Sequence, residues 1–335
     1  MTSLQIKQAG IAAWILAGLG VLAVLHLHLL PSLLAGLLVF ELVHLLAPSL
    51  QRHFASERSR LVALFLLASL VVGAVTAAVI GTLAFFKGGG NIVLLFAKMA
   101  QILEDARSTL PPWLVHLLPE NEDSLRGASI DWLRGHAAEL RSIGKEAGLT
   151  LAHVLIGMII GAMISLEQAM PSTSRGPLAS ALIERTSAFA EAFRRIVFAQ
   201  VRISALNTVL TAIYLAVALP MFGVHLPLTK TLIAVTFIAG LLPVIGNLIS
   251  NTIIVIVSLA HSPHTALFSL LFLVVVHKLE YFLNAHIVGG QINAKAWELL
   301  IAMLLMEALF GLPGVVAAPI VYAWIKGELD KAGWL

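Results

Sequence analysis

The chain alternates long uncharged apolar stretches with short charged segments, and the length of each stretch indicates how often it crosses a membrane. A membrane-spanning helix needs about 20 mostly apolar residues to cross about 30 Å of hydrocarbon. Residues 10–50 carry a single charge, Glu41, and suit two spans with a tight turn at Pro31 and Ser32. The pattern predicts single further spans at 61–86, 147–166, 203–229 and 299–325.

One apolar stretch, residues 231–277, is too long for one helix and is interrupted by Pro243, Gly246, Asn247 and Pro263. Dividing it brings the total to about eight membrane segments, of which one or two are interrupted or re-entrant. The predicted fold class is therefore an all-α polytopic membrane protein with a small external helical segment.

The positions of arginine residues predict the orientation of the chain. Arginines outnumber acidic residues in segments 51–60 and 171–202, so both are expected on the cytoplasmic side. The N-terminus is then expected to be cytoplasmic. We interpret the first apolar stretch as a retained span and not as a removed signal peptide. Segment 87–146, with apolar residues at helical spacing, is expected outside as a cap or an oligomer contact. The stretch within 171–202 is either an amphipathic helix on the inner membrane face or a helical linker. The predicted divisions are 1–86, 87–146, 147–170, 171–202, 203–326 and a tail at 327–335.

The composition excludes several classes of protein. Hydrophobic residues make up 59% of the chain and charged residues 12%, against about 25% charged in soluble domains. This balance excludes a conventional soluble enzyme, a nucleic-acid-binding protein and a disordered chain. The chain has no cysteine, so it has no disulfide and no thiolate metal site. No cofactor motif, metal-ligand pattern or nucleophile–base arrangement is visible, which argues against an enzyme.

Acidic residues inside apolar stretches are the first candidates for function, because burying a charge at mid-membrane costs roughly 2.5–3.5 kcal/mol. Glu41 lies near the middle of the second predicted span, and His44 follows one turn later on the same face. The pair could relay protons; alternatively, Glu41 is neutral and hydrogen-bonded to a neighbouring helix. Glu307 lies within the last predicted span without an obvious local partner.

Glu280 lies beyond the long apolar stretch, follows His277 and precedes Asn284. His277 and Glu280 share a helix face, so the group is either part of a transport path or a polar cluster at the end of a span.

Two interruptions of apolar segments are further candidates. Broken helices free backbone groups that protein or cavity water must satisfy, and they often frame transporter sites. The first interruption, Gly240 to Asn247, is followed one turn later by Asn251; a hairpin turn near the membrane surface would explain it equally well. The second runs from Phe310 to Gly314. The residues of the helix-break motif are Pro243, Gly246, Gly311, Gly314 and Pro319.

Several C-terminal motifs together resemble the signature of the autoinducer-2 exporter family of predicted permeases. They are Leu242-Pro-Val-Ile-Gly246, Leu279-Glu-Tyr-Phe-Leu-Asn284, Ile287-Val-Gly289, Phe310-Gly-Leu-Pro-Gly314 and Ala318-Pro319. The resemblance implies an all-helical, oligomeric protein of the bacterial inner membrane. The resemblance also implies the positions of the family's motif residues. The turn of the family falls on Pro243 and Gly246, its glutamate on Glu280, its asparagine on Asn284, and its late glycines and proline on Gly311, Gly314 and Pro319. The chain departs from the family at Ala285 and His286, where many members have proline.

Three hypotheses for function follow. The first is a membrane transporter that exports a small polar solute such as a signalling molecule, with cation coupling through the acidic residues. The second, which the resemblance also implies, is a sodium(lithium)/proton antiporter of the same fold. The third is a non-transporting membrane scaffold that acts through segment 87–146 or through the helix within 171–202. The expected partners are the lipid bilayer, further copies of the chain, and a small solute or monovalent cation.

Overall fold

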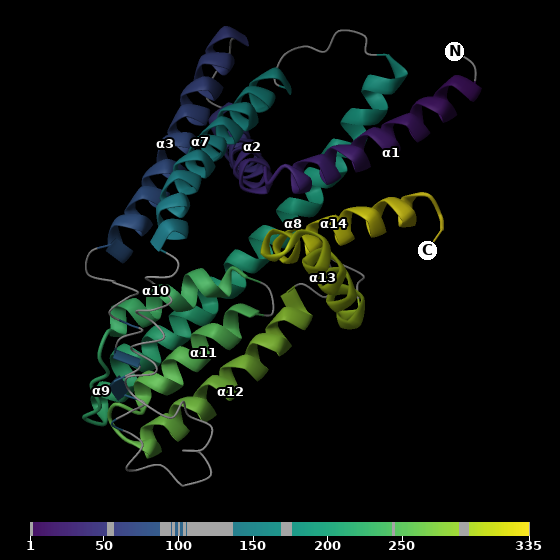
Figure 1. The fold of residues 1–335 in the computed structure, drawn as a ribbon. Coiled ribbons are helices and arrows are strands. Elements are labelled where there is room, and N and C mark those ends of the chain that lie inside the picture. The colour runs from purple at the N-terminus through teal and green to yellow at the C-terminus, as the bar shows by residue number, and fades with distance from the viewer. Residues whose placement is uncertain are drawn as a thin grey trace. The chain divides into compact units, whose positions relative to one another are not determined.

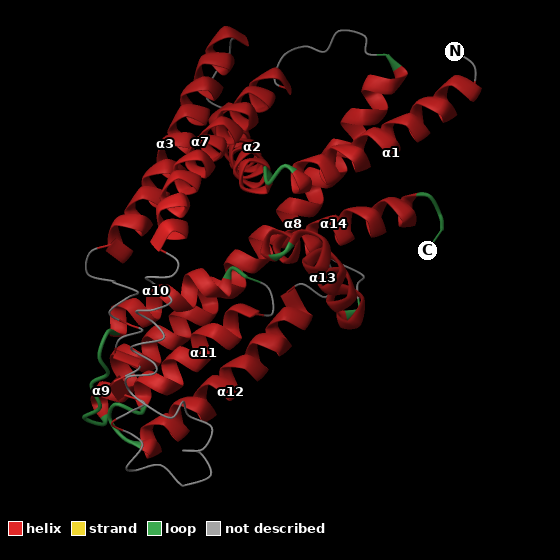
Figure 2. Cartoon of the chain, in the orientation of Figure 1, coloured by secondary structure: helices red, strands yellow, loops and turns green. Residues whose placement is uncertain are grey.

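The computed structural model describes residues 3–51, 57–87, 137–168, 176–242, 245–287 and 295–334, and positions 95, 98, 99, 101, 102 and 105. Every regular element in these ranges is a helix (Figures 1 and 2), which confirms the predicted all-α fold. The elements are α1 (Ser3–His26), α2 (Leu30–Gln51), α3 (Glu57–Lys87), α7 (Ala137–Gln168), α8 (Pro177–Ile213), the π-helix η1 (Tyr214–Ala218), α9 (Leu219–Met221), α10 (Thr229–Gly240), α11 (Ile245–Ser258), α12 (Pro263–Ile287), α13 (Ala296–Phe310) and α14 (Leu312–Lys331).

The chain forms two compact units, each made of discontinuous segments. Unit 1 consists of residues 1–79, 145–197 and 292–335, and unit 2 consists of residues 80–144 and 198–291. The chain passes from one unit to the other within α3, α7 and α8, so these helices contribute residues to both.

Five helical stretches in the described part are long and apolar enough to cross a membrane. This confirms a multi-pass helical protein, while the predicted number of eight segments is not confirmed. The five stretches are Gln8–His26, Leu30–Pro48, Val62–Thr82, Leu149–Glu167 and Pro177–Met221. The last stretch is longer than predicted. The sequence pattern predicts a boundary between a surface helix and a span after residue 202, but α8 continues through this position.

The apolar stretch 231–277 is interrupted, as predicted, and lies on three helices. Helix α10 has 12 residues and α11 has 14, which corresponds to lengths of about 18 and 21 Å. Neither length covers the roughly 30 Å of a bilayer core. The two helices pack against each other, so we describe them as the α10–α11 hairpin.

In unit 1, α2, α3 and α7 pack around a shared apolar core. Figure 1 shows α3 and α7 side by side, and buried residues of α2, α3 and α7 form one cluster that includes Val43, Leu64 and Met158. Helices α2 and α7 approach through glycines: an added methyl group at Gly157 would overlap the Ser32 carbonyl, and one at Gly161 would overlap the Gly36 carbonyl. The Gly157-x-x-x-Gly161 spacing therefore serves close helix packing.

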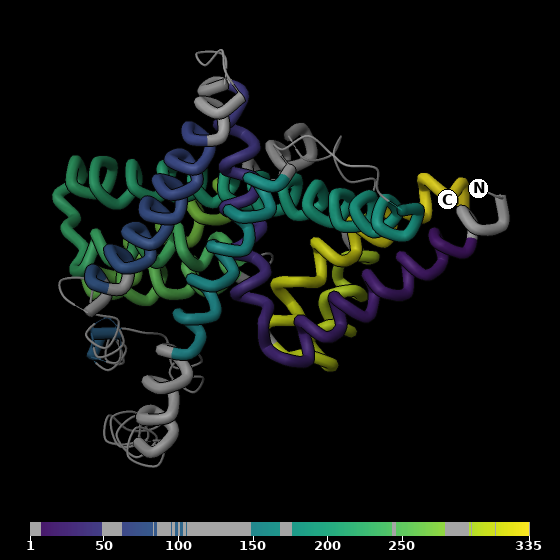
Figure 3. Tube along the Cα trace, turned by 90° about the horizontal axis from the view of Figure 1, so that it is seen from above, coloured from purple at the N-terminus to yellow at the C-terminus, as the bar shows by residue number. Residues whose placement is uncertain are grey.

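The C-terminal helix α14 packs against α1 and the first half of α8 within unit 1. The rings of Trp14 and Trp324 stack with centroids 5.4 Å apart, and Phe189 meets Trp324 edge-on at 5.5 Å. Arg185 of α8 forms an ion pair with Glu328 of α14, and its guanidinium lies 5.6 Å from the Trp14 ring. These contacts hold α14 against α1 (Figure 3).

Replacing Gly161 by alanine is expected to destabilise the contact between α2 and α7. The added methyl group would meet backbone, which cannot rotate away, so the helices must separate. We expect a loss of about 1–3 kcal/mol, measured as a lower melting temperature of the detergent-purified protein. Gly73→Ala is the matched control, because nothing lies within 4 Å of the added methyl group in α3. Equal melting temperatures for the two variants would contradict this packing.

Removing the Glu328 carboxylate is expected to lower the free energy of unfolding by more than Gly161→Ala does. The Glu328 side chain is 1% exposed and Arg185 is 18% exposed, so Glu328→Gln leaves a largely buried cation without its partner. Breaking such a pair costs about 3–5 kcal/mol. Lys331→Met is the control, because Lys331 also contacts Glu328, at 3.4 Å, but is 56% exposed, and exposed pairs contribute about 1 kcal/mol or less. Similar unfolding temperatures for the two variants would show that burial of the pair is unimportant.

Candidate functional site

A row of polar side chains on α8 faces the α10–α11 hairpin in unit 2. Gln200 donates from Nε2 to the Gly240 carbonyl oxygen at 2.6 Å, and Ser204 donates from Oγ to the Phe237 carbonyl oxygen at 2.6 Å. Asn207 donates from Nδ2 to Oδ1 of Asn247 at 2.9 Å. The spacing of four and then three residues places all three donors on one face of α8. We call these three residues the α8 polar row.

The α8 polar row completes the hydrogen bonding at the end of α10. The last four carbonyl groups of a helix have no partner within the helix. Ser204 and Gln200 bind the carbonyls of Phe237 and Gly240, while the two carbonyls between them accept backbone N–H groups at 3.2 and 2.8 Å. All four terminal carbonyls of α10 are therefore satisfied by groups of the protein.

Two glycines allow this close arrangement. A methyl group at Gly240 would lie 2.6 Å from the Ser204 hydroxyl oxygen, and one at Gly246 would overlap the Ala239 carbonyl. Gly246 is buried at the start of α11, where it brings α10 and α11 into contact. Pro243, its partner in the predicted motif, lies outside the described residues.

Buried hydroxyl groups extend the row towards the other end of the hairpin. Thr211, one turn beyond Asn207, is 0% exposed and its Oγ1 has no hydrogen-bond partner in the described part of the chain. Tyr214 follows, at the start of the π-helix, with its hydroxyl 2.9 Å from Ser269 Oγ, which lies 2.7 Å from Ser258 Oγ. π-Helices are rare and occur frequently at functional sites.

Glu41 is buried in α2, and its ion-pair partner comes from α8. Its Oε2 lies 3.8 Å from Nε of Arg194, whose side chain is 49% exposed. This separation is longer than a hydrogen bond. His44 lies one turn further along α2 but is exposed, with its ring 5.3 Å from that of Phe40. The structure thus brings Glu41 to Arg194, and places His44 in different surroundings.

The second predicted interruption is the turn between α13 and α14 in unit 1. Gly311 joins the helices with φ +65° and ψ −150°, a conformation that glycine adopts at little cost. Gly314 is buried against the Met306 carbonyl, and Pro319 is buried inside α14. Glu307 lies on the exposed face of α13. The motif therefore builds a close helical hairpin, and Glu307 points away from it.

The start of α13 carries a separate polar group. Glu298 accepts hydrogen bonds from the Tyr322 hydroxyl and, at 2.7 Å, from Lys326 Nζ. The bond from Lys326 is the largest of the effects that lower the pKa of Glu298 to about 2. This carboxylate is therefore ionised at neutral pH and joins α13 to α14.

Three remaining candidates are placed only in part. Asn251 is half-buried in α11, one turn after Asn247. Glu280 and Asn284 belong to α12, but their side chains lie outside the described residues. Their part in a transport path stays a prediction.

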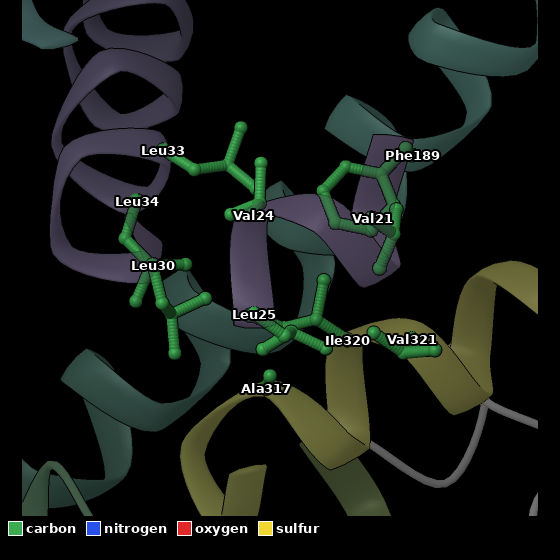
Figure 4. A pocket seen from close by; sticks show the side chains of 10 residues that line it. All are labelled: Val21, Val24, Leu25, Leu30, Leu33, Leu34, Phe189, Ala317, Ile320 and Val321. Carbon is green, nitrogen blue, oxygen red and sulfur yellow. The ribbon is translucent and has the colours of Figure 1, made fainter. Parts of the chain in front are cut away.

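The cavities in the described part differ in chemistry. In unit 1 a gap of about 10 Å³ lies between α1, α2, α8 and α14 (Figure 4), and only apolar side chains line it. A gap of this size and polarity holds no polar solute. In unit 2 a cleft of about 510 Å³ lies beside the α11–α12 turn, with Lys98, Gln101, Asp105, His261 and Ser262 among its lining residues.

No group of three or more metal-ligating side chains occurs among the described residues. The α8 polar row offers neutral amide and hydroxyl groups, which bind polar solutes or water without fixing a charge. Glu41 and Arg194 form an ion pair in which the cation is half-exposed. The arrangement supports binding and movement of a solute.

Sequence reasoning missed the α8 polar row and Arg194. The recognisable signal was the spacing of Gln200, Ser204 and Asn207, but the predicted boundary after residue 202 divided it between a surface helix and a span. Arg194 was used only as a marker of the cytoplasmic side.

Comparison with known proteins identifies the family. No curated protein and no solved structure matches the chain significantly. The model of one family, described as the AI-2E family transporter, matches residues 10–332. The match covers nearly the whole described fold, including the α8 polar row, the hairpin and both interrupted segments. The chain therefore belongs to the AI-2E family of membrane transporters.

Proposed function

We propose that the chain exports a small polar solute and that the solute passes the contact between α8 and the α10–α11 hairpin. The observation that carries this proposal is the α8 polar row, which meets a helix break with three neutral donors at 2.6–2.9 Å. Polar groups inside a membrane protein are costly, and those beside broken helices commonly mark a transport path. Because this row has no charged member, it favours an uncharged or weakly charged solute.

Cation coupling through Glu41 is the second part of the proposal. A buried carboxylate needs a partner, and Glu41 has an ion pair at 3.8 Å with a half-exposed arginine. A proton or a monovalent cation could replace Arg194 without breaking a short hydrogen bond.

The same observation at Glu41 supports sodium(lithium)/proton antiport as a second candidate function. Antiport requires no organic solute, so sodium or lithium alone should collapse a proton gradient in vesicles that contain the protein. Solute export requires efflux of the solute itself. A scaffold would produce neither effect.

Replacing Asn207 by leucine is expected to slow export. Leucine has a similar size but cannot bind Asn247 or a solute. Losing one hydrogen bond of about 1.4 kcal/mol corresponds to a roughly ten-fold effect. The measurement is efflux of preloaded autoinducer-2 from proteoliposomes that contain the purified protein.

Thr208→Val is the matched control for this test. The Thr208 hydroxyl bonds the Ser204 carbonyl of its own helix at 2.7 Å, so it contributes nothing to the contact with the hairpin. We expect Thr208→Val to keep normal efflux. Equal protein-dependent efflux by Asn207→Leu and by the wild type would show that the α8 polar row is not part of the transport path. Export itself would be refuted if the wild type produced no protein-dependent efflux of any solute in a panel of small polar solutes.

Glu41→Gln is expected to abolish the response to an imposed cation gradient. The amide cannot be ionised, so a proton or sodium ion cannot exchange with Arg194. We expect an inward proton or sodium gradient to accelerate efflux by the wild type and by Glu191→Gln, in which an exposed carboxylate is lost instead. A gradient response that survives in Glu41→Gln would show that coupling occurs elsewhere.

A further inference from the structure

The two ends of the α10–α11 hairpin differ in how much apolar packing holds them. Near the α11–α12 turn, Leu232 of α10 and Ile254 and Val257 of α11 pack in the apolar core of unit 2 with Leu215 and Leu273, beside the hydrogen bond between Ser258 and Ser269. At the opposite end, the last turn of α10 and the first turn of α11 are held by the α8 polar row. We call these the apolar end and the latched end of the hairpin.

The two kinds of contact differ in whether a polar solute can replace them. Apolar packing has no substitute in water or in a polar solute, because exposing it costs free energy in proportion to the area exposed. A hydrogen bond to a carbonyl can be exchanged for one to water or to a solute hydroxyl at little net cost. The latched end is therefore the end that can open.

The hairpin is built to move as one body at this end. Gly246 seats α11 directly on the Ala239 carbonyl of α10, so the two helices touch backbone to backbone. This contact keeps α10 and α11 together while their bonds to α8 change.

Thr211 indicates where a polar group goes when the latch is open. Its hydroxyl is fully buried one turn beyond Asn207 and has no bond partner in the described part of the chain. A buried hydroxyl without a partner is costly and calls for an occupant such as a water molecule or a solute oxygen.

We propose that the α8 polar row is a latch on a gate, in which Gln200, Ser204 and Asn207 hold the latched end of the hairpin closed and release it when solute or water takes over their bonds. This inference rests on the proposed transport function. It assigns the moving element to the α10–α11 hairpin and the hinge to its apolar end.

A cross-link between Asn207→Cys and Asn247→Cys tests the gate, and the absence of native cysteine makes the chain a ready background. The side chains of the two asparagines are 2.9 Å apart. We expect oxidation, or a short bifunctional thiol reagent, to lower autoinducer-2 efflux from proteoliposomes at least ten-fold below the efflux of the same double variant in its reduced form, and reduction to restore that level.

Ser258→Cys with Ser269→Cys is the matched control pair. Their hydroxyl oxygens are 2.7 Å apart and join α11 to α12 at the apolar end. A gate hinged there keeps transporting when this pair is cross-linked. If both cross-links block efflux equally, the hairpin does not hinge at its apolar end, and the proposal fails.

A second measurement does not depend on the double variant being active. Gln200→Met removes the donor to Gly240 while keeping the size of the side chain. With Asn247→Cys as the reporter, we expect Gln200→Met to raise the rate of labelling by a small thiol reagent at least five-fold, with the melting temperature nearly unchanged. An unchanged labelling rate would overturn the latch.

The outcomes separate the latch from the proposed function. If the reduced Asn207→Cys/Asn247→Cys protein shows efflux and the cross-link leaves that efflux unchanged, the gate is refuted and export still stands. No efflux by the wild type, together with faster labelling in Gln200→Met, would refute export and leave a movable hairpin.

Discussion

A helix that ends inside a membrane leaves its last carbonyl groups without water, and another part of the fold must satisfy them. In unit 2 the carbonyl groups at the end of α10 are satisfied by α8, which supplies Gln200 and Ser204. This pairing explains why α8 is polar along the face that meets the hairpin, although much of its outer surface in the same stretch, such as Val209 and Ile213, is apolar and exposed. The break in the hairpin and the α8 polar row are thus two parts of one feature.

Two buried carboxylates of unit 1 differ in how closely their partners contact them. Glu328 is hydrogen-bonded to Arg185 and also contacts Lys331, and the ring of Trp14 covers the arginine. Both oxygens of this carboxylate have a cationic partner, and its removal leaves a buried cation. Glu41 has instead one ion pair at 3.8 Å with a half-exposed arginine. Burial alone would rank the two carboxylates alike, whereas the distances to their partners and the exposure of those partners distinguish them.

Local patterns in the sequence predicted what depends on local chemistry. Apolar length located four of the five long helical stretches and the second half of the fifth, and proline with glycine located both interruptions. Contacts between distant segments were beyond this reasoning. The nearest ionisable neighbour of Glu41 in the sequence is His44, but the side chain that pairs with it is Arg194, more than a hundred residues away. The α8 polar row was missed for a related reason, since its donors become meaningful only when the carbonyls of α10 lie opposite them.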